Sequence, residues 1–365
     1  MLNSIKKMKK ICEIPMQSGK KKIYLSLILP MIFGMGILKS NADSWVQKAN
    51  FGGPARLNAV GFSIGTKGYI GTGWYLPSPS NVLKDFWEWD QATNTWAQKA
   101  DFGGTARLYA TGFAIGAKGY IGTGVDGISS YRKDFWEWNQ ATNTWTQKAD
   151  FGGTARQGAK GFVIGNKGYV GTGLDGGIGY RNDFWEYNQS TDSWTQKANF
   201  GGTVRSDGIG FNIGTKGYLG TGADATSIYH DKDFWEYDSG ADTWTQKADF
   251  GGTSREETIG FSIGTKAYIG TGYDSGGNTN DFWEWNQSTN LWTQKTNFGG
   301  AARYGAVAFV IGANGYAGTG GNTTDFWQYN PDVTSSSIPT LSQWGLIAFS
   351  VLVLGAGIFF IRRIT

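Results

Sequence analysis

The chain has 365 residues, of which 15% are aromatic and 57 are Gly, whereas only 7 are Pro. This composition favours many short strands joined by tight turns over helices or disorder. The formal charge of +4 comes from the two ends, and residues 43–361 hold 23 basic and 28 acidic residues. A mildly acidic body gives no electrostatic reason to expect nucleic-acid binding.

Residues 1–42 have the features of an export signal. Lys20–Lys22 precede the apolar run Ile23–Leu38, and Ser40 and Ala42 occupy the small-residue positions of a cleavage site after Ala42. The apolar run is short for a membrane span, although an uncleaved membrane anchor is the alternative. We predict a signal peptide at residues 1–42, exported by the Sec machinery and removed by signal peptidase.

One unit is repeated six times in residues 43–330. The motif DFW begins at 85, 134, 183, 233, 281 and 325, and GTG begins at 71, 122, 171, 220, 270 and 318. An Arg recurs at Arg56, Arg107, Arg156, Arg205, Arg255 and Arg303. This period predicts an all-β fold, a six-bladed β-propeller with four strands in each blade. A β-helix or solenoid is the alternative, but its coils are usually shorter.

The four strands of the first unit can be placed. We expect strands at residues 55–65, 68–73, 85–90 and 95–101, with tight turns at Thr66–Lys67 and at residues 91–94. Side chains alternate between the faces of a strand, so Phe86 and Trp87 point to opposite faces. An isolated sheet would expose one of these aromatic rings to water. Blades packed face to face bury both, which stabilises the fold by roughly 1.5–3 kcal/mol for each large side chain.

The chain begins with the last strand of its own repeat. The segment SWVQK (44–48) resembles the fourth strand of each unit, whereas the sixth unit stops near Pro331 without a fourth strand. We therefore predict that residues 44–48 pair with residues 325–330 and close the ring, which removes an exposed sheet edge. A frayed N-terminal strand is the alternative.

The repeats also resemble Kelch repeats. Kelch units have a Tyr followed seven positions later by a Trp, as in Tyr187 with Trp194 and Tyr237 with Trp244. The sequence departs from the pattern in two ways: GTG replaces the Kelch glycine pair, and a Trp replaces the Tyr at Trp89, Trp138 and Trp285. The resemblance covers residues 44–330 and implies a secreted Kelch-type propeller, but it implies little about activity.

Several catalytic chemistries lack the residues they need. The only Cys, Cys12, lies in the predicted leader, and the only His, His230, lies in a polar loop. The copper site of galactose-oxidase-like Kelch proteins is therefore excluded, and no Ser-His-Asp motif supports His230. Residues 274–281 have oxygen ligands at alternate positions like a Ca²⁺ loop, but the remaining acidic ligands are missing. We expect an ordinary turn there, and no metal or cofactor.

A set of variable loops predicts a binding surface. The loop before the first strand and the loop between the second and third strands should lie on one face, and the second loop differs most among repeats. Aromatic and Arg side chains on such a rim suit protein contacts and sugar stacking equally well. The candidates are Trp74, Tyr75, Tyr131, Arg132, Tyr180, Arg181, Tyr229 and Tyr273, with the six recurring Arg residues at the channel mouth. For those six Arg residues we favour structural pairing with the Asp of DFW or with backbone carbonyls, because all six units need the same packing whereas a ligand would break the symmetry.

A Lys and a Glu change together among the repeats. Five units carry a Lys in the turn between the first two strands and a Glu in FWE, whereas the sixth has the neutral Asn314 and Gln328. We predict that the two side chains interact in each of the five units. The pairs are Lys67–Glu88, Lys118–Glu137, Lys167–Glu186, Lys216–Glu236 and Lys266–Glu284.

The C-terminus has the parts of a sorting signal. Residues 331–337 are a polar spacer, residues 344–361 carry no charge and are long enough to span a membrane, and Arg362 and Arg363 follow. The start of segment 338–365 resembles the IPTL-type sorting signal through Ile338, Pro339, Thr340, Leu341, Trp344 and Gly345. The resemblance implies a membrane-anchored precursor that an exosortase-like transpeptidase cuts, leaving the mature protein at the cell surface or extracellular. A permanent anchor is the alternative.

These features together predict an exported, cell-surface propeller that is not an enzyme. We expect it to act as a binding or scaffold module for an unidentified protein or glycan. A metal-free carbohydrate-active enzyme, such as a protein like the sialic-acid epimerases, is the competing interpretation.

Overall fold

The computed structural model describes residues 42–75, 81–127, 130–176, 179–224 and 231–332. Residues 42–332 form a compact unit of their own. The described residues are organised as β-strands, turns and connecting segments, and they contain no helix that is long and apolar enough to cross a membrane. The predicted signal peptide, apart from Ala42, and the predicted sorting and membrane segments lie outside the described residues.

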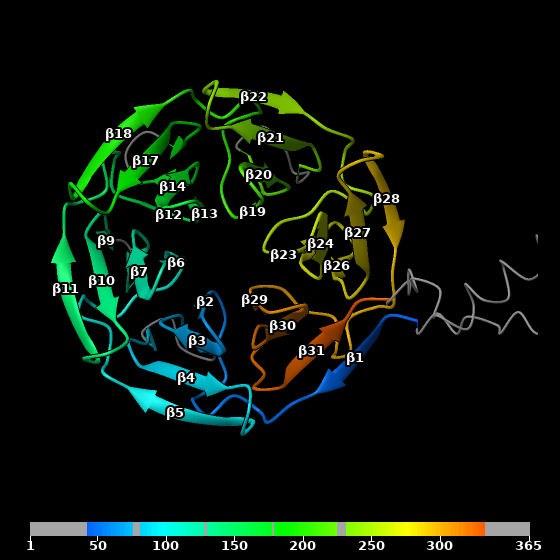
Figure 1. Ribbon diagram of the computed structural model, residues 1–365, viewed down its shortest axis with the longest axis horizontal. Helices are drawn as coiled ribbons and strands as arrows, with labels where there is room; N and C mark the ends of the chain where they lie inside the picture. The colour runs from blue at the N-terminus through cyan, green and yellow to red at the C-terminus, as the bar shows by residue number, and fades with distance from the viewer. Residues whose placement is uncertain (1–41, 76–80, 128–129, 177–178, 225–230, 333–365) are drawn as a thin grey trace, which may run out of the picture. The chain divides into compact units, whose positions relative to one another are not determined.

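The unit is built from six four-stranded antiparallel sheets, which stand around a common centre as in a β-propeller (Figure 1). Sheet 1 contains β2 (Val60–Ile64), β3 (Lys67–Gly71), β4 (Phe86–Asp90) and β5 (Thr95–Lys99). Sheet 2 contains β6 (Thr111–Ile115), β7 (Lys118–Gly122), β10 (Phe135–Asn139) and β11 (Thr144–Lys148). Sheet 3 contains β13 (Lys160–Ile164), β14 (Lys167–Gly171), β17 (Phe184–Asn188) and β18 (Ser193–Lys197).

The second half of the unit repeats this order. Sheet 4 contains β19 (Ile209–Ile213), β20 (Lys216–Gly220), β21 (Phe234–Asp238) and β22 (Thr243–Gln246). Sheet 5 contains β23 (Ile259–Ile263), β24 (Lys266–Gly270), β27 (Phe282–Asn286) and β28 (Leu291–Gln294). Sheet 6 contains β29 (Val307–Ile311), β30 (Asn314–Gly318), β31 (Phe326–Asn330) and β1 (Ser44–Gln47). The innermost strands contact one another in a closed order: β2, β6, β13, β19, β23, β29 and again β2.

The first strand of each unit is shorter than the sequence indicates. In sheet 1 it begins at Val60 rather than at residue 55, because Asn58 has a φ of +53°, which ends extended structure. The turn that follows consists of Gly65 and Thr66, since Ile64 pairs directly with Lys67. Lys67 therefore opens β3 rather than lying in the turn.

Apolar side chains form a core between each pair of neighbouring sheets. Phe86 lies in a cluster with Trp138 of sheet 2, whereas Trp89 of the same strand lies in a cluster with Phe326 of sheet 6. Phe86 and Trp89 are 0% and 1% exposed. Trp87, which is half-buried, packs against the sheet 6 side. The prediction that both faces of the third strand are covered is confirmed.

The predicted ring closure is also confirmed. Strand β1 pairs antiparallel with β31, in the register Ser44 with Asn330 and Trp45 with Tyr329. The ring of Trp45 lies 5.0 Å, centroid to centroid, from each of the rings of Phe282, Phe298 and Tyr329. The first strand of the chain thus completes the last sheet (Figure 1).

The predicted Lys–Glu contacts form in three of five units. Lys118 Nζ lies 3.2 Å from Glu137 Oε1, and the equivalent atoms in sheets 3 and 5 are 3.3 and 2.7 Å apart. In sheets 1 and 4 the Lys pairs instead at 2.5 Å with Asp90 or Asp238. These two Asp residues stand directly opposite the Lys in the strand ladder, whereas the other three units have Asn there. Where an Asp stands opposite the Lys in the ladder, the Lys therefore pairs with that Asp instead of with the Glu.

Two closed cycles of backbone hydrogen bonds link the six repeats. In the inner cycle, one residue per repeat donates its amide to the equivalent carbonyl of the preceding repeat, over 2.8 to 3.2 Å. All six residues have a left-handed conformation, with φ between 52° and 66°. We call them the axial ring: Asn58, Tyr109, Gly158, Asp207, Glu257 and Gly305. In the second cycle, the last Gly of each GTG donates to the carbonyl of the Arg in the next repeat, over 2.6 to 2.8 Å.

The variable loops add small strands beside the axial ring. They form the hairpins β8 (Val125–Asp126) with β9 (Ser130–Tyr131), β15 (Leu174–Asp175) with β16 (Gly179–Tyr180), and β25 (Tyr273–Asp274) with β26 (Gly277–Asn278). Strand β12 (Arg156–Gln157) pairs with β15. Isolated bridges join Leu57 to Trp74 and Glu256 to Tyr273. The loop before the first strand and the variable loop therefore lie side by side, as predicted.

Candidate functional site

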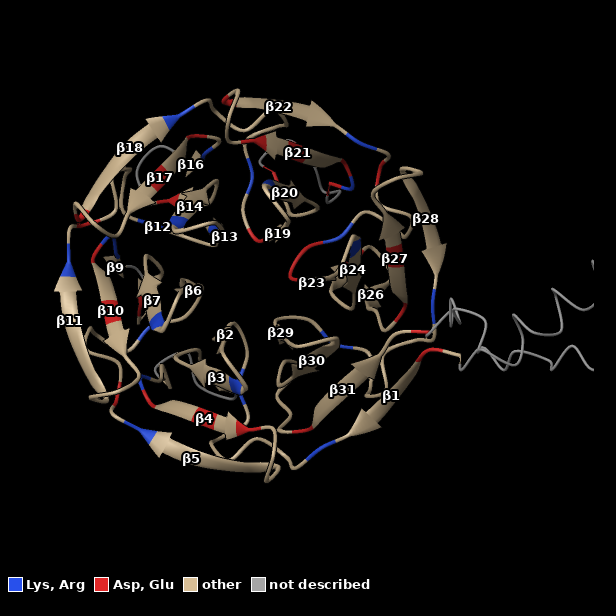
Figure 2. Cartoon of the chain, in the orientation of Figure 1, with Lys and Arg blue, Asp and Glu red and all other residues tan. Residues whose placement is uncertain are grey.

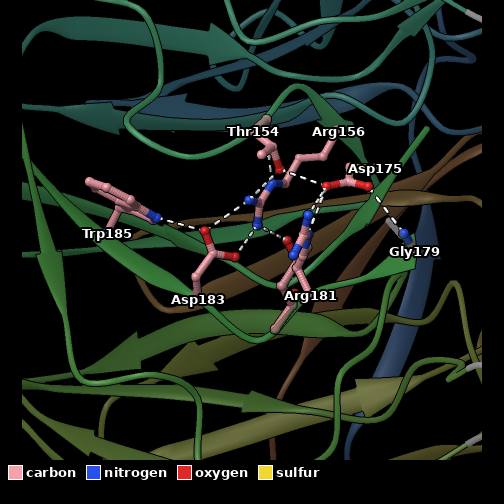
Figure 3. A network of polar contacts seen from close by, with 8 residues as sticks. Thr154, Arg156, Asp175, Gly179, Arg181, Asp183 and Trp185 are labelled. Atoms are coloured by element: carbon pink, nitrogen blue, oxygen red, sulfur yellow. Dashed lines mark hydrogen bonds and ion pairs between the residues drawn. The ribbon is translucent and has the colours of Figure 1, made fainter. Parts of the chain in front are cut away.

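The recurring Arg residues are the most buried charged groups of the fold. Figure 3 shows Arg156, whose Nη1 donates to Asp183 Oδ1 at 2.5 Å and whose Nη2 donates to Asp183 Oδ2 at 2.8 Å. Nη1 and Nε also donate to the carbonyls of Thr172 and Thr154, at 2.9 and 3.0 Å. Burial works against ionisation of Asp183, but the hydrogen bonds and charge of Arg156 outweigh it and lower the pKa of Asp183.

The same arrangement occurs in all six repeats. Each Arg is at most 2% exposed, pairs with the Asp of its DFW motif, and lies over a Phe ring at 4.7 to 5.1 Å. A guanidinium group has five N–H donors, and protein acceptors occupy nearly all of them here. In the structure, all six recurring Arg residues are therefore held in buried pairs with the Asp of DFW: Arg56, Arg107, Arg156, Arg205, Arg255 and Arg303.

A Thr connects the buried pair to the variable loop in sheet 3. Thr154 Oγ1 accepts from Arg156 Nη2 at 3.0 Å and donates to Asp175 Oδ2 at 2.9 Å. Asp175 in turn accepts from Arg181 Nε at 2.7 Å and from the amide of Gly179 at 3.1 Å (Figure 3). The invariant scaffold thus fixes the base of a variable hairpin. The equivalent Thr253 contacts Asp274 in sheet 5, whereas Pro54 and Ala301 replace the Thr in sheets 1 and 6.

The predicted rim residues fall into three groups. Tyr273 is 44% exposed, and the other described aromatic residues, Trp74, Tyr75, Tyr131 and Tyr180, are half-buried. Arg132 and Arg181 fold back onto Asp126 and Asp175 within their own hairpins. Tyr229, like His230, lies outside the described residues.

An open groove of about 870 Å³ passes beside one of these hairpins. Its walls include Tyr131 and Arg132 from the variable loop of sheet 2, together with Lys84 and Trp136. The structure therefore brings two of the predicted rim residues to one concave surface. Within residues 274–281, where we expected an ordinary turn, Asp274 pairs with Gly277 across the β25–β26 turn, and Asp274 Oδ1 accepts from the amide of Gly276 at 2.8 Å.

The axial ring carries a cluster of acidic and polar side chains that the sequence interpretation missed. Figure 2 shows acidic segments on the inner side of the ring, where the chain enters β19 and β23. Tyr109 Oη donates across the ring to Glu257 Oε1 at 3.0 Å, and Ser206 Oγ donates to Asp207 Oδ2 at 2.8 Å. Within the described part of the chain, three other buried atoms of this cluster have no hydrogen-bond partner: Asn58 Nδ2, Asp207 Oδ1 and Glu257 Oε2.

The carboxyl groups of this cluster are hard to ionise. Burial and the neighbouring charges of Asp207 and Glu256 raise the pKa of Glu257 to about 8. Burial and the charge of Asp207 raise the pKa of Glu256 to about 7, and burial raises the pKa of Asp207. The positive charge of Lys160 opposes the rise in pKa of Asp207, Glu256 and Glu257.

Two tyrosines, Tyr180 and Tyr304, lie near the acidic cluster. Burial, followed by the charges of Glu256, Asp207 and Asp224, raises the pKa of Tyr180, which places this variable-loop residue beside the cluster. Burial and the charge of Glu257 raise the pKa of Tyr304, whose ring meets that of Tyr273 edge to face at 6.0 Å. The innermost strands also line a narrow central channel of about 130 Å³, to which Lys160 contributes.

One sequence signal could have revealed this cluster. The two residues after each recurring Arg are LN, LY, QG, SD, EE and YG, so they vary between otherwise similar segments. The second residue of each pair occupies the axial ring, where packing demands a left-handed conformation but leaves the side chain free to vary.

Comparison with known proteins identifies the C-terminus and supports the fold. Residues 336–363 match the family model described as the IPTL-CTERM motif. The chain therefore carries a C-terminal sorting signal, which supports an exported, cell-surface protein. A solved structure titled "Structure of YjhT" is similar to this chain, with a TM-score of 0.63, 17% sequence identity, and coverage of 76% of this chain and 96% of that chain. At that identity the likeness concerns the fold alone. No curated protein matches the sequence.

Proposed function

We propose that the chain is an exported, six-bladed, Kelch-type propeller that acts at the cell surface as a non-enzymatic binding or scaffold module for a protein or a glycan. The observation that carries this proposal is the grouping of variable positions. The axial ring and the variable loops differ between repeats, and isolated bridges hold them side by side. The residues that recur form the cores and the buried Arg–Asp pairs.

Delivery to the surface follows from the two ends of the chain. We infer removal of residues 1–42 by signal peptidase and cleavage near Leu341 by an exosortase-like enzyme, as the matched motif implies. Intact-mass and C-terminal peptide analysis of the protein from its native host tests this. We expect no mature peptide that continues from Leu341 into residues 344–361. If such peptides dominate, the segment is a permanent anchor.

A metal-free carbohydrate-active enzyme is the second candidate. Glu256 and Glu257, with pKa values raised to about 7 and about 8, have the proton affinity that acid–base catalysts need near neutral pH. However, an anionic sugar such as a sialic acid would raise the pKa values of these carboxyl groups further and would repel any of them that ionise. Among carbohydrate substrates, this site suits a neutral or cationic sugar better.

One experiment separates the two candidates. Residues 42–332 would be applied to a glycan array and to a pull-down of surface proteins, and every retained sugar would then be incubated with the protein and followed by NMR. Retention without chemical change supports the binding module. Reproducible turnover that Glu257→Gln abolishes supports the enzyme.

A further inference from the structure

We propose that Lys295 and Asp332 become joined by an intramolecular isopeptide bond, with Glu284 as the group that relays the proton. The bond fastens the point where the chain leaves sheet 6 to the neighbouring sheet 5. This inference goes beyond the proposed binding function and concerns a modification that the chain makes on itself. It depends on the distances among three side chains, on their low exposure, and on the rigid elements that carry them.

The three side chains meet where the chain leaves β31 and contacts sheet 5. Lys295 follows β28, and its amide donates to the carbonyl of Phe282 at 2.8 Å, which continues the ladder between β28 and β27. Asp332 follows the end of β31 after Pro331. Lys295 Nζ lies 3.1 Å from Asp332 Oδ2 and 3.8 Å from Glu284 Oε2. An amine therefore contacts one carboxyl group of its own sheet and one that follows sheet 6.

The Lys–Glu pair of sheet 5 is less exposed than its equivalents. The Lys295 side chain is 10% exposed and the Glu284 side chain is 8% exposed. The same Glu in the first four sheets is 16–20% exposed. The equivalent Lys side chains in those sheets are 20–24% exposed: Lys99, Lys148, Lys197 and Lys247. Less water around the pair favours a reaction that releases water.

Glu284 is held in place beside the reacting amine. Its Oε1 lies 2.7 Å from Lys266 Nζ, and its Oε2 accepts from Tyr268 Oη at 3.1 Å. Burial, followed by the charge and hydrogen bond of Glu284 and the charge of Asp332, raises the pKa of Tyr268, so both carboxyl groups lie near this phenol. Proton-transfer partners often stand farther apart before the reaction than during it, which a separation of 3.8 Å from Lys295 Nζ allows.

Both ends of the propeller contact the segment that carries the amine. Asp43 Oδ2 accepts from the amide of Thr296 at 2.9 Å and from Tyr329 Oη at 3.2 Å. Thr296 directly follows Lys295. The pairing of β1 with β31 and of β27 with β28 therefore holds the amine and Asp332 on two connected sheets.

Fixed positions of this kind favour condensation over hydrolysis. An amine and a carboxylate that are free in solution remain separate ions, because water is present in excess. Groups held in contact reach effective concentrations of about 10⁵–10⁸ M, far above that of water. Asp332 Cγ is at most one C–O bond farther from Lys295 Nζ than Oδ2 is. A small rotation of the carboxyl group therefore gives the approach of about 3–3.5 Å that the reaction requires.

The reaction needs no other reagent. Glu284 transfers one proton from the Lys295 ammonium group to the Asp332 carboxylate, and the neutral amine then attacks Cγ. The Nζ–Cγ bond forms, a second proton passes from Nζ through Glu284 to one Asp332 oxygen, and that Cγ–O bond breaks. The oxygen leaves as water with the two protons, one N–H remains in the amide, and Glu284 returns to its starting state. Nothing is oxidised or reduced.

The bond suits a chain that is held at a surface through its C-terminus. Residues 43–365 contain no Cys, so a disulfide cannot fasten the exported unit. A pull on the segment after Asp332 acts on β31, which lies between β1 and β30. With the bond in place, the load passes through Lys295 to sheet 5 before it reaches β31.

Peptide mapping of the mature protein from its native host tests the proposal. We expect the peptides that carry Lys295 and Asp332 as one linked species, whose mass is lower than their sum by one water molecule. In full chains expressed in the same host, Lys295→Arg and Asp332→Ala should abolish the linked species. Glu284→Gln should lower its yield by roughly tenfold or more. Lys247→Arg is the matched control, because it changes the equivalent pair with Glu236, and it should leave the linked species intact.

Three results overturn the proposal. Separate Lys295 and Asp332 peptides as the dominant form of the parent would show that the contact is only an ion pair. A linked species that persists in Lys295→Arg would place the bond at another residue, and an unchanged yield in Glu284→Gln would remove the proton relay. Lys295→Arg keeps the positive charge, and melting curves show whether each variant is folded. The map of the parent decides whether the bond exists even if a variant fails to fold.

Discussion

Truncation of Trp45 tests whether the first strand of the chain holds the ring closed. The Trp45 side chain packs against Phe282, Phe298 and Tyr329, with all three centroid distances at 5.0 Å, and its Nε1 donates to the carbonyl of Thr296 at 3.3 Å. Core Trp→Ala changes cost about 3–5 kcal/mol. Because Trp45 is half-buried, we expect Trp45→Ala to lower the free energy of unfolding by about 3 kcal/mol, at the lower end of that range.

The matched control is the equivalent Trp of an internal strand. Trp145 packs against Phe86 and Phe102 at 5.2 and 5.1 Å and donates to the carbonyl of Ala100 at 3.1 Å. Urea unfolding of residues 42–332, followed by circular dichroism, should give similar losses for Trp45→Ala and Trp145→Ala. For a unit of this size the melting temperature should fall by roughly 5–10 °C.

Unequal losses of stability would contradict ring closure by β1. If Trp45→Ala leaves the free energy of unfolding unchanged while Trp145→Ala lowers it, β1 is a frayed strand and does not close the ring. Deleting residues 44–48 provides a second variant, because it removes every β1 hydrogen bond to β31. The same conclusion would follow if that deletion left the melting temperature unchanged.

Three further changes probe the charged groups. Asp183→Asn leaves the buried Arg156 without its countercharge, so the free energy of unfolding measured in urea should fall by an amount on the order of 3 kcal/mol. A fall of less than about 1 kcal/mol would mean that the pair is dispensable. Burial and nearby charges raise the pKa of Glu257 from 4.5 to about 8, so the stability present below pH 4.5 is lost as the pH rises through 8. The free energy of unfolding of Glu257→Gln should therefore equal that of the parent at pH 4 and exceed it by on the order of 4 kcal/mol at pH 9. Identical pH profiles of stability for the two proteins would contradict the raised pKa. Lys118→Met removes a partly exposed pair with Glu137 and should cost about 0–1 kcal/mol, so a larger loss in the same unfolding assay would show that the contact is more than a surface pair.

The architecture could be predicted from the sequence because the same pattern of residues recurs in each repeat. The spacing of DFW and GTG, and the unmatched strand at residues 44–48, led to the four-stranded sheets and to the pairing of β1 with β31. The alternation of Phe86 and Trp87 indicated that both faces of a sheet are covered. Averaging over six copies removes the ambiguity that a single short strand would have.

Reliance on the features that the six repeats share also concealed the candidate site, because its side chains differ between repeats. The axial ring depends on a left-handed residue at Asn58 and its equivalents, which an apolar strand pattern does not reveal. The sequence also left open whether the recurring Arg residues bind a ligand, because an Arg that pairs with a distant Asp is known only once the strands are placed. Likewise, the choice of Lys67 between Glu88 and Asp90 depends on which carboxylate stands opposite it in the ladder.

The most direct test of the account asks where the protein binds its ligands. Three forms of residues 42–332 would be compared on the same glycan array and surface-protein pull-down: the parent, a variable-face form and an outer-strand form. The variable-face form carries Tyr131→Ala, Tyr180→Ala and Tyr273→Ala, and the outer-strand form carries Thr146→Ala, Thr195→Ala and Leu291→Ala, all at exposed outer positions. We predict that the parent and the outer-strand form retain the same ligands and that the variable-face form loses them. Retention by the variable-face form, or loss by the outer-strand form, would contradict the assignment of binding to this face.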